Sequence, residues 1–409
     1  MKVESKIQEN ILVLTHWSFN DALIQAYTLP YVHIIRKIVP IERKIILVTS
    51  EQPSKAISPE ELTQLKAKLQ KLNIDLITFP YRRIGTKKLI EMASHLYKLF
   101  YVIKNMRVTT IHCFCTPAGA IGYLLSKISS VHLILDSYEP HAEAMIENGS
   151  WSQWGFAYRL LFLMEKLQTH RARYTIGAAL GMRDYARSRY RIDPRNFQVK
   201  AACVNLEKFS RSMRDTTLAE ELGLNGKIVC VYAGKLGGIY LKEEVFDFLS
   251  ECYYFWGNRF RFLFLTDADP KLVRDEMKRV AIPEEIVIQQ FLPHDQVPRY
   301  LALGDFAINP VKPVPTKKYC TSIKDGEYWA TGLPVIITKD ISDDSNIIAS
   351  EDIGYVLQQL DREEYKRAIR KIDSLIQSET THVRIREIAV RYRNFDIAEK
   401  IYRRIYSKL

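Results

Sequence analysis

Residues 321–338 read TSIKDGEYWATGLPVIIT, and this stretch predicts a capped helix that runs into a buried strand. Ser322 is a favourable N-cap residue, and Asp325 completes the sequence pattern of a capping box. Gly332 and Pro334 are expected to end the helix. The apolar, β-branched run at 335–338 is typical of a strand. The stretch therefore predicts one helix–strand unit of an α/β sheet.

The start of this predicted helix suits a phosphate group. Free backbone N–H groups and the positive end of the helix dipole attract anions there, and Lys324 adds a full positive charge in the first turn. Glu327 follows about one turn further in, roughly 5 Å along the helix axis. That distance fits a ribose beside a diphosphate. The residues therefore predict a nucleotide-binding site, although an ordinary capped helix would have a similar pattern.

The same residues resemble the donor-nucleotide segment of the retaining glycosyltransferases of family 4. The matching features are the serine, the lysine, the Glu-Tyr pair and the Gly-Leu-Pro-Val-Ile run. The resemblance implies that Ser322 holds the diphosphate, Lys324 offsets the charge of the leaving group, and Glu327 binds the ribose hydroxyls. Many members carry a second glutamate where this chain has Tyr319, so the resemblance leaves the sugar unassigned.

Apolar strand-like runs alternate with helical patterns along the whole chain, which favours parallel α/β sheets. The order restarts after Phe209, which predicts two α/β domains. The predicted strands are 11–15, 44–49, 76–79, 110–114, 133–136, 174–177 and 197–201, then 227–233, 260–266, 286–290, 306–308 and 335–338. The predicted helices include 21–38, 59–72, 86–105, 117–129, 154–173, 242–255 and 384–405.

The family resemblance implies the GT-B fold, in which two Rossmann-like domains face a cleft. Residues 202–209 resemble the family's crossing between domains, and 135–140 and 149–151 resemble a segment of the first domain. We expect an N-terminal acceptor domain over 1–205 and a nucleotide-sugar donor domain over 206–387. The C-terminal helix, 388–409, is expected to pack back on the first domain.

Two loops of the second domain are further candidates for the donor site. A strand ends in Gly234-Lys235-Leu236-Gly237-Gly238, and glycines after a strand let backbone N–H groups approach a phosphate. Such loops also merely turn the chain. The resemblance places this loop against the diphosphate, with a basic residue that Lys235 or Lys242 could supply. It also places Leu292, in the stretch 291–294, beside the nucleobase.

Polar residues at the end of strand 133–136 are the candidates of the first domain. Ligands of open α/β sheets bind at the carboxyl ends of strands, so we expect Asp136 and then His141 to be catalytic together with Lys324, with Glu139 and Glu143 close by. A retaining reaction by front-face attack needs no dedicated base, because the leaving phosphate can take the acceptor's proton. A polar surface loop is the alternative, and His112 is expected to be a core histidine.

No metal or cofactor is expected. Asp267 and Asp269 have the spacing of a metal-binding pair, but Pro270 follows and favours a turn. The six cysteines show no two-residue spacing typical of zinc or redox sites, so we expect buried free thiols in a reducing compartment. The nucleoside-diphosphate sugar would be a substrate.

The net charge of +12 is concentrated in two stretches. Basic faces attract anionic lipids or phosphorylated substrates, so an anionic membrane surface or a polyprenyl-linked acceptor is one interpretation and a merely solvated face is the other. The basic residues are Arg82, Arg83, Lys87, Lys88, Lys98, Lys104 and Arg107, and Arg384, Arg386, Arg391, Arg393, Lys400, Arg403, Arg404 and Lys408.

The chain is expected to be cytoplasmic. No run approaches the roughly 20 apolar residues that span a bilayer, and the N-terminus leads into a strand-like run rather than a secretory signal. Association with the inner face of the cell membrane would follow from the basic stretches. No basic motif interleaved with aromatic residues predicts nucleic-acid binding.

These observations lead to a functional hypothesis and two rivals. The hypothesis is a retaining, metal-independent glycosyltransferase that moves a sugar from a nucleoside-diphosphate donor to a glycan or lipid-linked acceptor in cell-surface polysaccharide synthesis. A sugar-nucleotide epimerase would act on the donor alone. A non-catalytic relative in a glycan-assembly complex is favoured by Tyr319 and by the first loop around Trp17, which lacks the paired glycines of many members.

Overall fold

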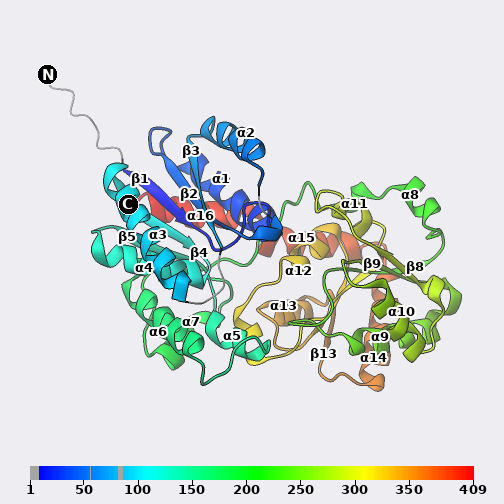
Figure 1. The fold of residues 1–409 in the computed structure, drawn as a ribbon. Helices are drawn as coiled ribbons and strands as arrows, with labels where there is room; N and C mark the ends of the chain where they lie inside the picture. Colours follow the sequence, from blue (N-terminus) through cyan, green and yellow to red (C-terminus); the bar gives the residue numbers. More distant parts are fainter. Residues whose placement is uncertain (1–8, 56, 82–85) are drawn as a thin grey trace. The chain divides into compact units, whose positions relative to one another are not determined.

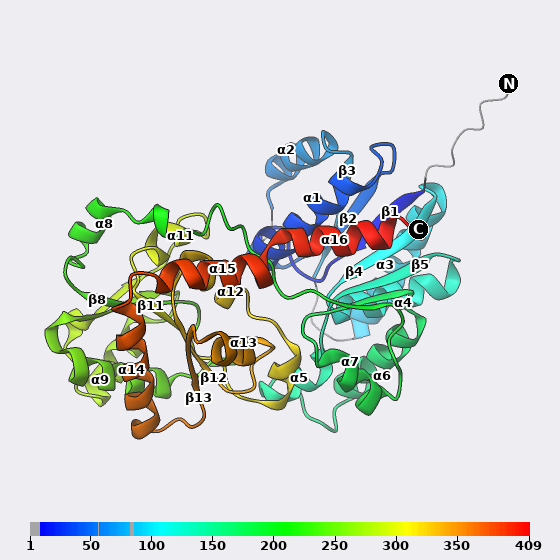
Figure 2. The same cartoon turned by 180° about the vertical axis from the view of Figure 1, so that it is seen from behind.

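A computed structural model describes residues 9–55, 57–81 and 86–409 of the chain. The backbone forms two compact units (Figures 1 and 2). The first unit comprises the chain up to Lys200 together with Asp396–Leu409, and the second comprises Ala201–Phe395. Each unit contains one parallel sheet with helices on its faces.

The sheet of the first unit has seven strands in the order β3-β2-β1-β4-β5-β6-β7. All of its pairings are parallel. The strands are β1 (Asn10–Leu14), β2 (Ile45–Glu51), β3 (Ile74–Pro80), β4 (Val108–Phe114), β5 (His132–Tyr138), β6 (Tyr174–Gly177) and β7 (Phe197–Val199).

The contacts made by alternate side chains of the strands show which helices cover each face of the first sheet. Side chains of a strand point to opposite faces in turn. Cys113 and Leu133 lie within contact distance of a Cβ added at Gly122, on α4 (Thr116–Ile128). His112, on the other face, stacks near Tyr406 of α16 (Phe395–Tyr406). The C-terminal helix α16 therefore packs on the first unit, on the face opposite α4 (Figure 2).

Short connections and helices complete the first unit. Tyr31 of α1 contacts Tyr402 of α16, so these two helices share one face of the sheet. The remaining elements are η1 (Leu23–Thr28), α1 (Leu29–Ile38), η2 (Pro53–Lys55), α2 (Pro59–Gln70), α3 (Thr86–Asn105), α5 (His141–Glu147), α6 (Phe156–Arg171), α7 (Met182–Tyr185) and η3 (Ala186–Tyr190).

The sheet of the second unit has six parallel strands in the order β10-β9-β8-β11-β12-β13. The order runs outward in both directions from the neighbouring pair β8 and β11, as in doubly wound folds. The strands are β8 (Ile228–Ala233), β9 (Phe260–Leu265), β10 (Val287–Gln290), β11 (Phe306–Asn309), β12 (Val335–Thr338) and β13 (Gly354–Leu357).

Two hydrophobic cores lie on the two faces of this sheet. Val229 and Val231 of β8 pack with α8, α11, α12, α13 and α15, whereas Cys230 and Tyr232 pack with α9, α10 and α14. The elements are η4 (Arg211–Met213), α8 (Thr216–Glu221), α9 (Glu243–Trp256), η5 (Gly257–Arg259), α10 (Pro270–Arg279), η6 (Glu284–Ile286), α11 (Val297–Leu301), η7 (Pro315–Tyr319), α12 (Ile323–Thr331), α13 (Asp344–Glu351), α14 (Arg362–Ile376) and α15 (Thr381–Arg393).

Every strand predicted from the sequence is present, with small shifts at the ends. One prediction is wrong, because the expected helix 384–405 is two helices that break at Asn394. The backbone of Asn394 is extended and forms a parallel bridge with Val204. Strand β13 was not predicted. It is a short strand next to β12, and its residue pattern carries little local signal.

The cysteines behave as expected for structural thiols. None of the six, all of which the structure describes, forms a disulfide; Cys113, Cys115, Cys203, Cys230 and Cys252 are buried, and Cys320 is half-buried. Burial raises the pKa of the Cys113 thiol, which makes it a poor nucleophile. Within the described ranges, no helix combines the length and apolar character needed to cross a membrane.

Gly354→Ala is expected to destabilise the second unit by about 2 to 3 kcal/mol, as overpacking does in tight sites. A Cβ at this position would lie 2.0 Å from the backbone oxygen of Val335 on the neighbouring strand, and that backbone cannot swing away as a side chain could. Urea unfolding followed by circular dichroism measures the change in unfolding free energy.

Gly226→Ala is the matched control for this substitution. Gly226 has a φ of +70° and open space around an added Cβ, so only the left-handed backbone is penalised, by about 1 kcal/mol. Equal losses in the two variants would contradict the steric explanation for Gly354.

Candidate functional site

The candidate donor site lies where the strand order of the second sheet reverses. Strands β8 and β11 are hydrogen-bonded neighbours whose connections lead to opposite sides. In open α/β sheets, ligands bind beyond the carboxyl ends of such a strand pair. Gly234 follows β8 and Pro310 follows β11, so these two loops form the base of the site.

The glycine-rich loop after β8 is tied to the segment after β11. Leu241 N–H donates to Pro310 O over 2.7 Å, and Lys312 N–H donates to Ile239 O over 3.0 Å. Gly237 and Gly238 both have positive φ values, of 75° and 62°, which favour glycine. The loop is therefore a defined turn whose shape depends on these glycines.

Helix α12 begins at the predicted position, with Ser322 as its N-cap and Gly332 in the left-handed conformation at its C-terminal end. The predicted capping box is wrong, because Ser322 makes no side-chain cap hydrogen bond. Instead, the Asn309 amide donates to Ser322 Oγ over 3.0 Å and to both carboxyl oxygens of Asp325 over 2.8 Å. Burial of Asp325 against β11 removes it from the cap.

Lys324 lies directly against the glycine-rich loop. Its Nζ donates to the Tyr240 hydroxyl over 2.7 Å and lies 4.5 Å from the centre of the Tyr240 ring. A Cβ at Gly234 would come within 2.7 Å of Lys324 Cε, so glycine is required for this close approach. The predicted residues Gly234 and Lys324 are therefore brought together, and Tyr240 is an unpredicted member of the site.

Glu327 lies one turn further along α12, and its carboxylate is almost fully buried. Its Oε1 lies 3.3 Å from His294 Nε2, and the His294 ring contacts Phe209 edge-on. Leu292, predicted to line the nucleobase, is partly buried and packs against the core on this face of the sheet. The pairing of Glu327 with His294 was not predicted, although both lie in stretches that the sequence had singled out.

Arg393 fixes the position of α12 through contacts of its buried side chain. The Arg393 guanidinium is fully buried and forms an ion pair with Asp344. It also donates to Thr321 Oγ1 over 2.8 Å and to Ala202 O over 3.1 Å, and it lies 5.2 Å from the Trp329 ring. The Arg393 side chain thus contacts both Thr321, the residue before the N-cap, and Trp329, in the last turn of the same helix.

Asp325 belongs to the same buried cluster. Burial raises the pKa of Asp325 well above its ordinary value, and the neighbouring Asp344 carboxylate adds to this, although Arg393 opposes both effects. The raised pKa of Asp325 favours its neutral form, and Arg393 forms its ion pair with Asp344. The total charge of Asp325, Asp344 and Arg393 next to the start of α12 is therefore close to neutral. The cluster does not repel an anion that binds at the helix start.

The two basic residues predicted to assist the diphosphate are each paired with a carboxylate in this structure. Lys235 Nζ lies 3.8 Å from Asp267 in an exposed pair, and Lys242 Nζ lies 3.3 Å from Glu276. Asp269 caps α10 by accepting from Lys271 N–H, which agrees with the turn predicted there.

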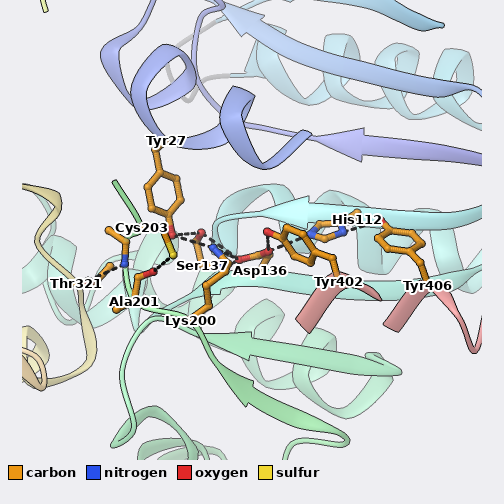
Figure 3. A network of polar contacts seen from close by, with 11 residues as sticks. Tyr27, His112, Asp136, Ser137, Lys200, Ala201, Cys203, Thr321, Tyr402 and Tyr406 are labelled. Carbon is orange, nitrogen blue, oxygen red and sulfur yellow. Dashed lines mark hydrogen bonds and ion pairs between the residues drawn. The ribbon is translucent and has the colours of Figure 1, made fainter. Parts of the chain in front are cut away.

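Asp136 is the centre of a buried network in the first unit (Figure 3). Its carboxylate lies 3.1 Å from Lys200 Nζ and 3.1 Å from His112 Nε2, and it accepts from the Tyr402 hydroxyl over 2.6 Å. Burial alone would raise the pKa of Asp136, but Lys200 and the hydrogen bonds from His112 and Tyr402 lower it to about 2. The Tyr406 hydroxyl lies 2.9 Å from His112 Nδ1.

This network favours a structural role for Asp136, whereas its catalytic role stays a prediction. Asp136 and Lys200 have no exposed side-chain surface. His112 is a satisfied core histidine, as predicted. Asp136 joins the sheet to Lys200, where the chain leaves the first unit, and to Tyr402, where the chain has returned.

The other polar residues near β5 have partners of their own. His141 begins α5 and is half-buried, and Glu143 accepts from the Tyr185 hydroxyl over 2.6 Å and pairs with Arg189. Thr116 Oγ1 donates to the backbone oxygen of Glu139 over 2.7 Å. The structure therefore leaves the predicted role of His141 as a prediction.

Most basic side chains of the two stretches are exposed where the structure describes them, namely Lys98, Lys104, Arg107, Arg384, Arg391, Lys400, Arg403, Arg404 and Lys408. Arg82 and Arg83 lie outside the described residues, as do the side chains of Lys87 and Lys88. In the C-terminal stretch, Arg393 is buried and Arg386 donates to the backbone oxygens of Leu206 and Phe209. Part of the positive charge therefore stabilises the second unit internally.

No protein-family model matches the chain, and a search of curated proteins finds no significant relative. Solved structures are similar over nearly the whole chain. HepE from Anabaena in complex with UDP has a TM-score of 0.70 at 14% identity and covers 98% of this chain and 100% of its own. A structure of HepE with UDP-glucose is similar as well.

Two further structures have the same architecture. Sucrose-phosphate synthase from Thermosynechococcus elongatus has a TM-score of 0.72 at 14% identity, over 98% of this chain and 100% of its own. WaaG, a glycosyltransferase involved in lipopolysaccharide biosynthesis, has a TM-score of 0.67 at 13% identity, over 96% and 98%. These likenesses confirm the α/β GT-B fold with two Rossmann-like units, and at this level of identity they show the fold alone.

Asp325→Asn is expected to make the unfolding free energy less dependent on pH. The folded protein retains the Asp325 proton above the ordinary carboxyl pKa of about 4, whereas the unfolded chain releases it. Wild-type stability therefore falls as the pH rises from that value toward the raised folded pKa. Asparagine removes this loss and can still accept from Asn309 and donate to Asp344.

Urea unfolding of both proteins at about pH 5 and pH 8 measures the effect. Asp184→Asn, at a carboxylate that is 82% exposed, is the control and should track the wild type at both pH values. If Asp325→Asn differs from the wild type by the same amount at both pH values, the proposed protonation of Asp325 is wrong.

Proposed function

We propose that the chain is a glycosyltransferase that takes its sugar from a nucleoside-diphosphate donor bound on the second unit. The observation that carries this proposal is the meeting of Lys324, Gly234 and the start of α12 at the point where the strand order reverses. Solved structures of this fold that hold UDP and UDP-glucose support the choice of ligand.

The start of α12 supplies the chemistry that a departing diphosphate needs. The first N–H groups of a helix lack intrahelical acceptors and carry partial positive charge, and the Ser322 hydroxyl lies at the same end. Lys324 adds a full charge once its ammonium moves from Tyr240 to the phosphate oxygens. Glu327, held by His294, would accept hydrogen bonds from the ribose hydroxyls.

We propose that the reaction retains the configuration at the anomeric carbon and requires no metal. The bond between that carbon and the diphosphate oxygen breaks, and the acceptor oxygen forms its bond on the same face. The acceptor's proton passes to the leaving phosphate oxygen, so no side chain needs to act as base. Lys324 stabilises the negative charge that develops on the leaving group.

The acceptor belongs to the first unit in this proposal. A glycan or polyprenyl-linked acceptor would bind there, with the half-buried His141, at the start of α5, as the remaining candidate. The chain would act in the cytoplasm, in the synthesis of a cell-surface polysaccharide. The family resemblance and the similarity to WaaG support this assignment.

Glu327→Ala is expected to weaken binding of UDP or GDP by roughly tenfold to a hundredfold, because hydrogen bonds to a charged group are lost. Isothermal titration calorimetry measures the dissociation constant directly. Glu363→Ala, on the exposed start of α14, is the control and should bind as the wild type does. Unchanged affinity in Glu327→Ala would remove Glu327 from the site.

Lys324→Ala is expected to lower turnover by on the order of a hundredfold, as loss of one electrostatic stabiliser of a transition state does. The release of nucleoside diphosphate measures sugar transfer. When no acceptor is present, it measures the slow hydrolysis of the donor. Lys278→Ala, at an exposed lysine of α10, is the matched control. A full rate in Lys324→Ala would refute its role at the leaving group.

The same assays separate the two rival functions. An epimerase would convert the sugar nucleotide without an acceptor, which proton NMR of the donor alone would detect. A non-catalytic subunit of a glycan-assembly complex would bind neither UDP nor GDP in the calorimeter.

A further inference from the structure

Helix α6 has an inverted distribution of polar and apolar residues. Helices of globular proteins normally bury their apolar stripe and expose their polar one. On α6 the buried residues are Glu165, Gln168 and Thr169. The exposed stripe begins at Phe156 and includes Leu160 and Leu163, which follow at helical spacing.

Specific partners hold most of the buried polar atoms of α6, although Gln168 Oε1 has no hydrogen-bond partner among the described residues. Glu165 accepts from Ala142 N–H over 2.8 Å and from the Tyr190 hydroxyl over 2.8 Å. The Gln168 amide donates to Thr116 O over 3.2 Å, which ties α6 to α4. These contacts fix the rotation of the helix about its axis. The outward position of the apolar stripe is therefore set by the polar network on the other side.

The outward face presents a continuous set of large apolar side chains. Trp154 is 74% exposed just before the helix, Phe156 is 73% exposed, and Leu163 is 48% exposed, with Leu160 between them. Scattered exposed apolar residues need no explanation, but a clustered stripe on one helix marks an interaction surface.

The exposed charges of α6 itself are all positive, and Glu143 of the neighbouring helix α5 is paired with Arg189. Arg159 and Lys166 are exposed on the same stripe as the leucines. Between Asn148 and Arg183 the only acidic residue is Glu165, which is buried and whose pKa burial raises to about 8. Helix α4, which packs beside α6 (Figure 2), contains no acidic residue.

We propose that the outward face of α6, formed by Trp154, Phe156, Leu160 and Leu163 with Arg159 and Lys166, binds an anionic membrane surface. Aromatic and leucine side chains of an interfacial helix enter the boundary between headgroups and acyl chains, while flanking cations remain at the phosphates. This surface is separate from the donor site on the second unit, and its binding does not require glycosyl transfer.

A membrane suits this face better than a protein or a nucleic acid does. Tryptophan beside a helix of phenylalanine, leucine and basic residues is the composition of membrane-interface segments. Each basic residue near an anionic surface contributes attraction without needing a matched partner geometry. A nucleic acid would leave the leucine stripe uncovered.

Co-sedimentation of the full-length chain with vesicles tests the proposal. The wild type is expected to bind vesicles of phosphatidylglycerol and phosphatidylcholine and to bind pure phosphatidylcholine vesicles roughly tenfold or more weakly. Leu160→Ser/Leu163→Ser is expected to lower the partition coefficient by about tenfold or more, because two apolar side chains no longer enter the interface. Arg159→Gln/Lys166→Gln is expected to give a similar loss at low salt.

Two control variants carry matched changes elsewhere. Val383→Ser/Val390→Ser removes two exposed apolar side chains from α15, and Arg274→Gln/Lys278→Gln removes two exposed cations from α10, outside both basic stretches. Both are expected to bind vesicles as the wild type does. Circular dichroism and UDP calorimetry on every variant show whether the two units remain folded.

Several results would overturn the proposal. These are failure of the wild type to bind anionic vesicles, full binding by a folded Leu160→Ser/Leu163→Ser variant, or equal losses in the controls. Analytical ultracentrifugation provides a further check. A wild-type dimer that Leu160→Ser/Leu163→Ser dissociates, together with no vesicle binding, would assign the face to a second copy of the chain. If the wild type does not bind UDP, the proposed function is refuted, but the proposal that this surface binds a membrane is unaffected.

Discussion

The ion pair between Arg393 and Asp344 is the constraint on which the candidate site depends. Both groups are fully buried, so each would be costly to bury without the other. Through its remaining donors Arg393 holds Thr321 and Ala202, and through its stem it lies against Gly326. The start of α12 is therefore fixed by a residue from the end of α15, far along the sequence. A site for an anion needs this rigidity, because its donors must stay aimed before the ligand arrives.

A second buried ion pair has a comparable position in the first unit. Asp136 and Lys200 lie at the end of β5, with His112 and Tyr402 completing the hydrogen bonds (Figure 3). In each unit a buried carboxylate thus forms an ion pair with a basic residue that lies, in the sequence, close to the point where the chain passes to the other unit. Apolar side chains could fill the same volume, but they would fix the direction of the connecting segments less specifically.

Local sequence signals predicted the strands and helices of two parallel α/β domains, and the family resemblance implied the GT-B fold and the candidate site residues. Gly332, Pro334 and the strand after them are local features, and Lys324 and Gly234 were each recognised in their own loops. The contacts of these residues were not predictable in the same way. Tyr240, His294 and Arg393 reach the site from other segments, and a sequence pattern carries no information on such distant pairs. The capping-box prediction failed for the same reason, because Asn309 from β11 takes the Asp325 carboxyl.

The central claim is that the start of α12 binds the diphosphate of a sugar nucleotide. A crystal structure of the chain soaked with UDP, and in parallel with GDP, measures this most directly. The account predicts electron density for the diphosphate at Ser322 and at Lys324, which would have left Tyr240, and for the ribose hydroxyls at Glu327. A nucleotide bound at any other place, or a helix start covered by protein side chains, would contradict the account.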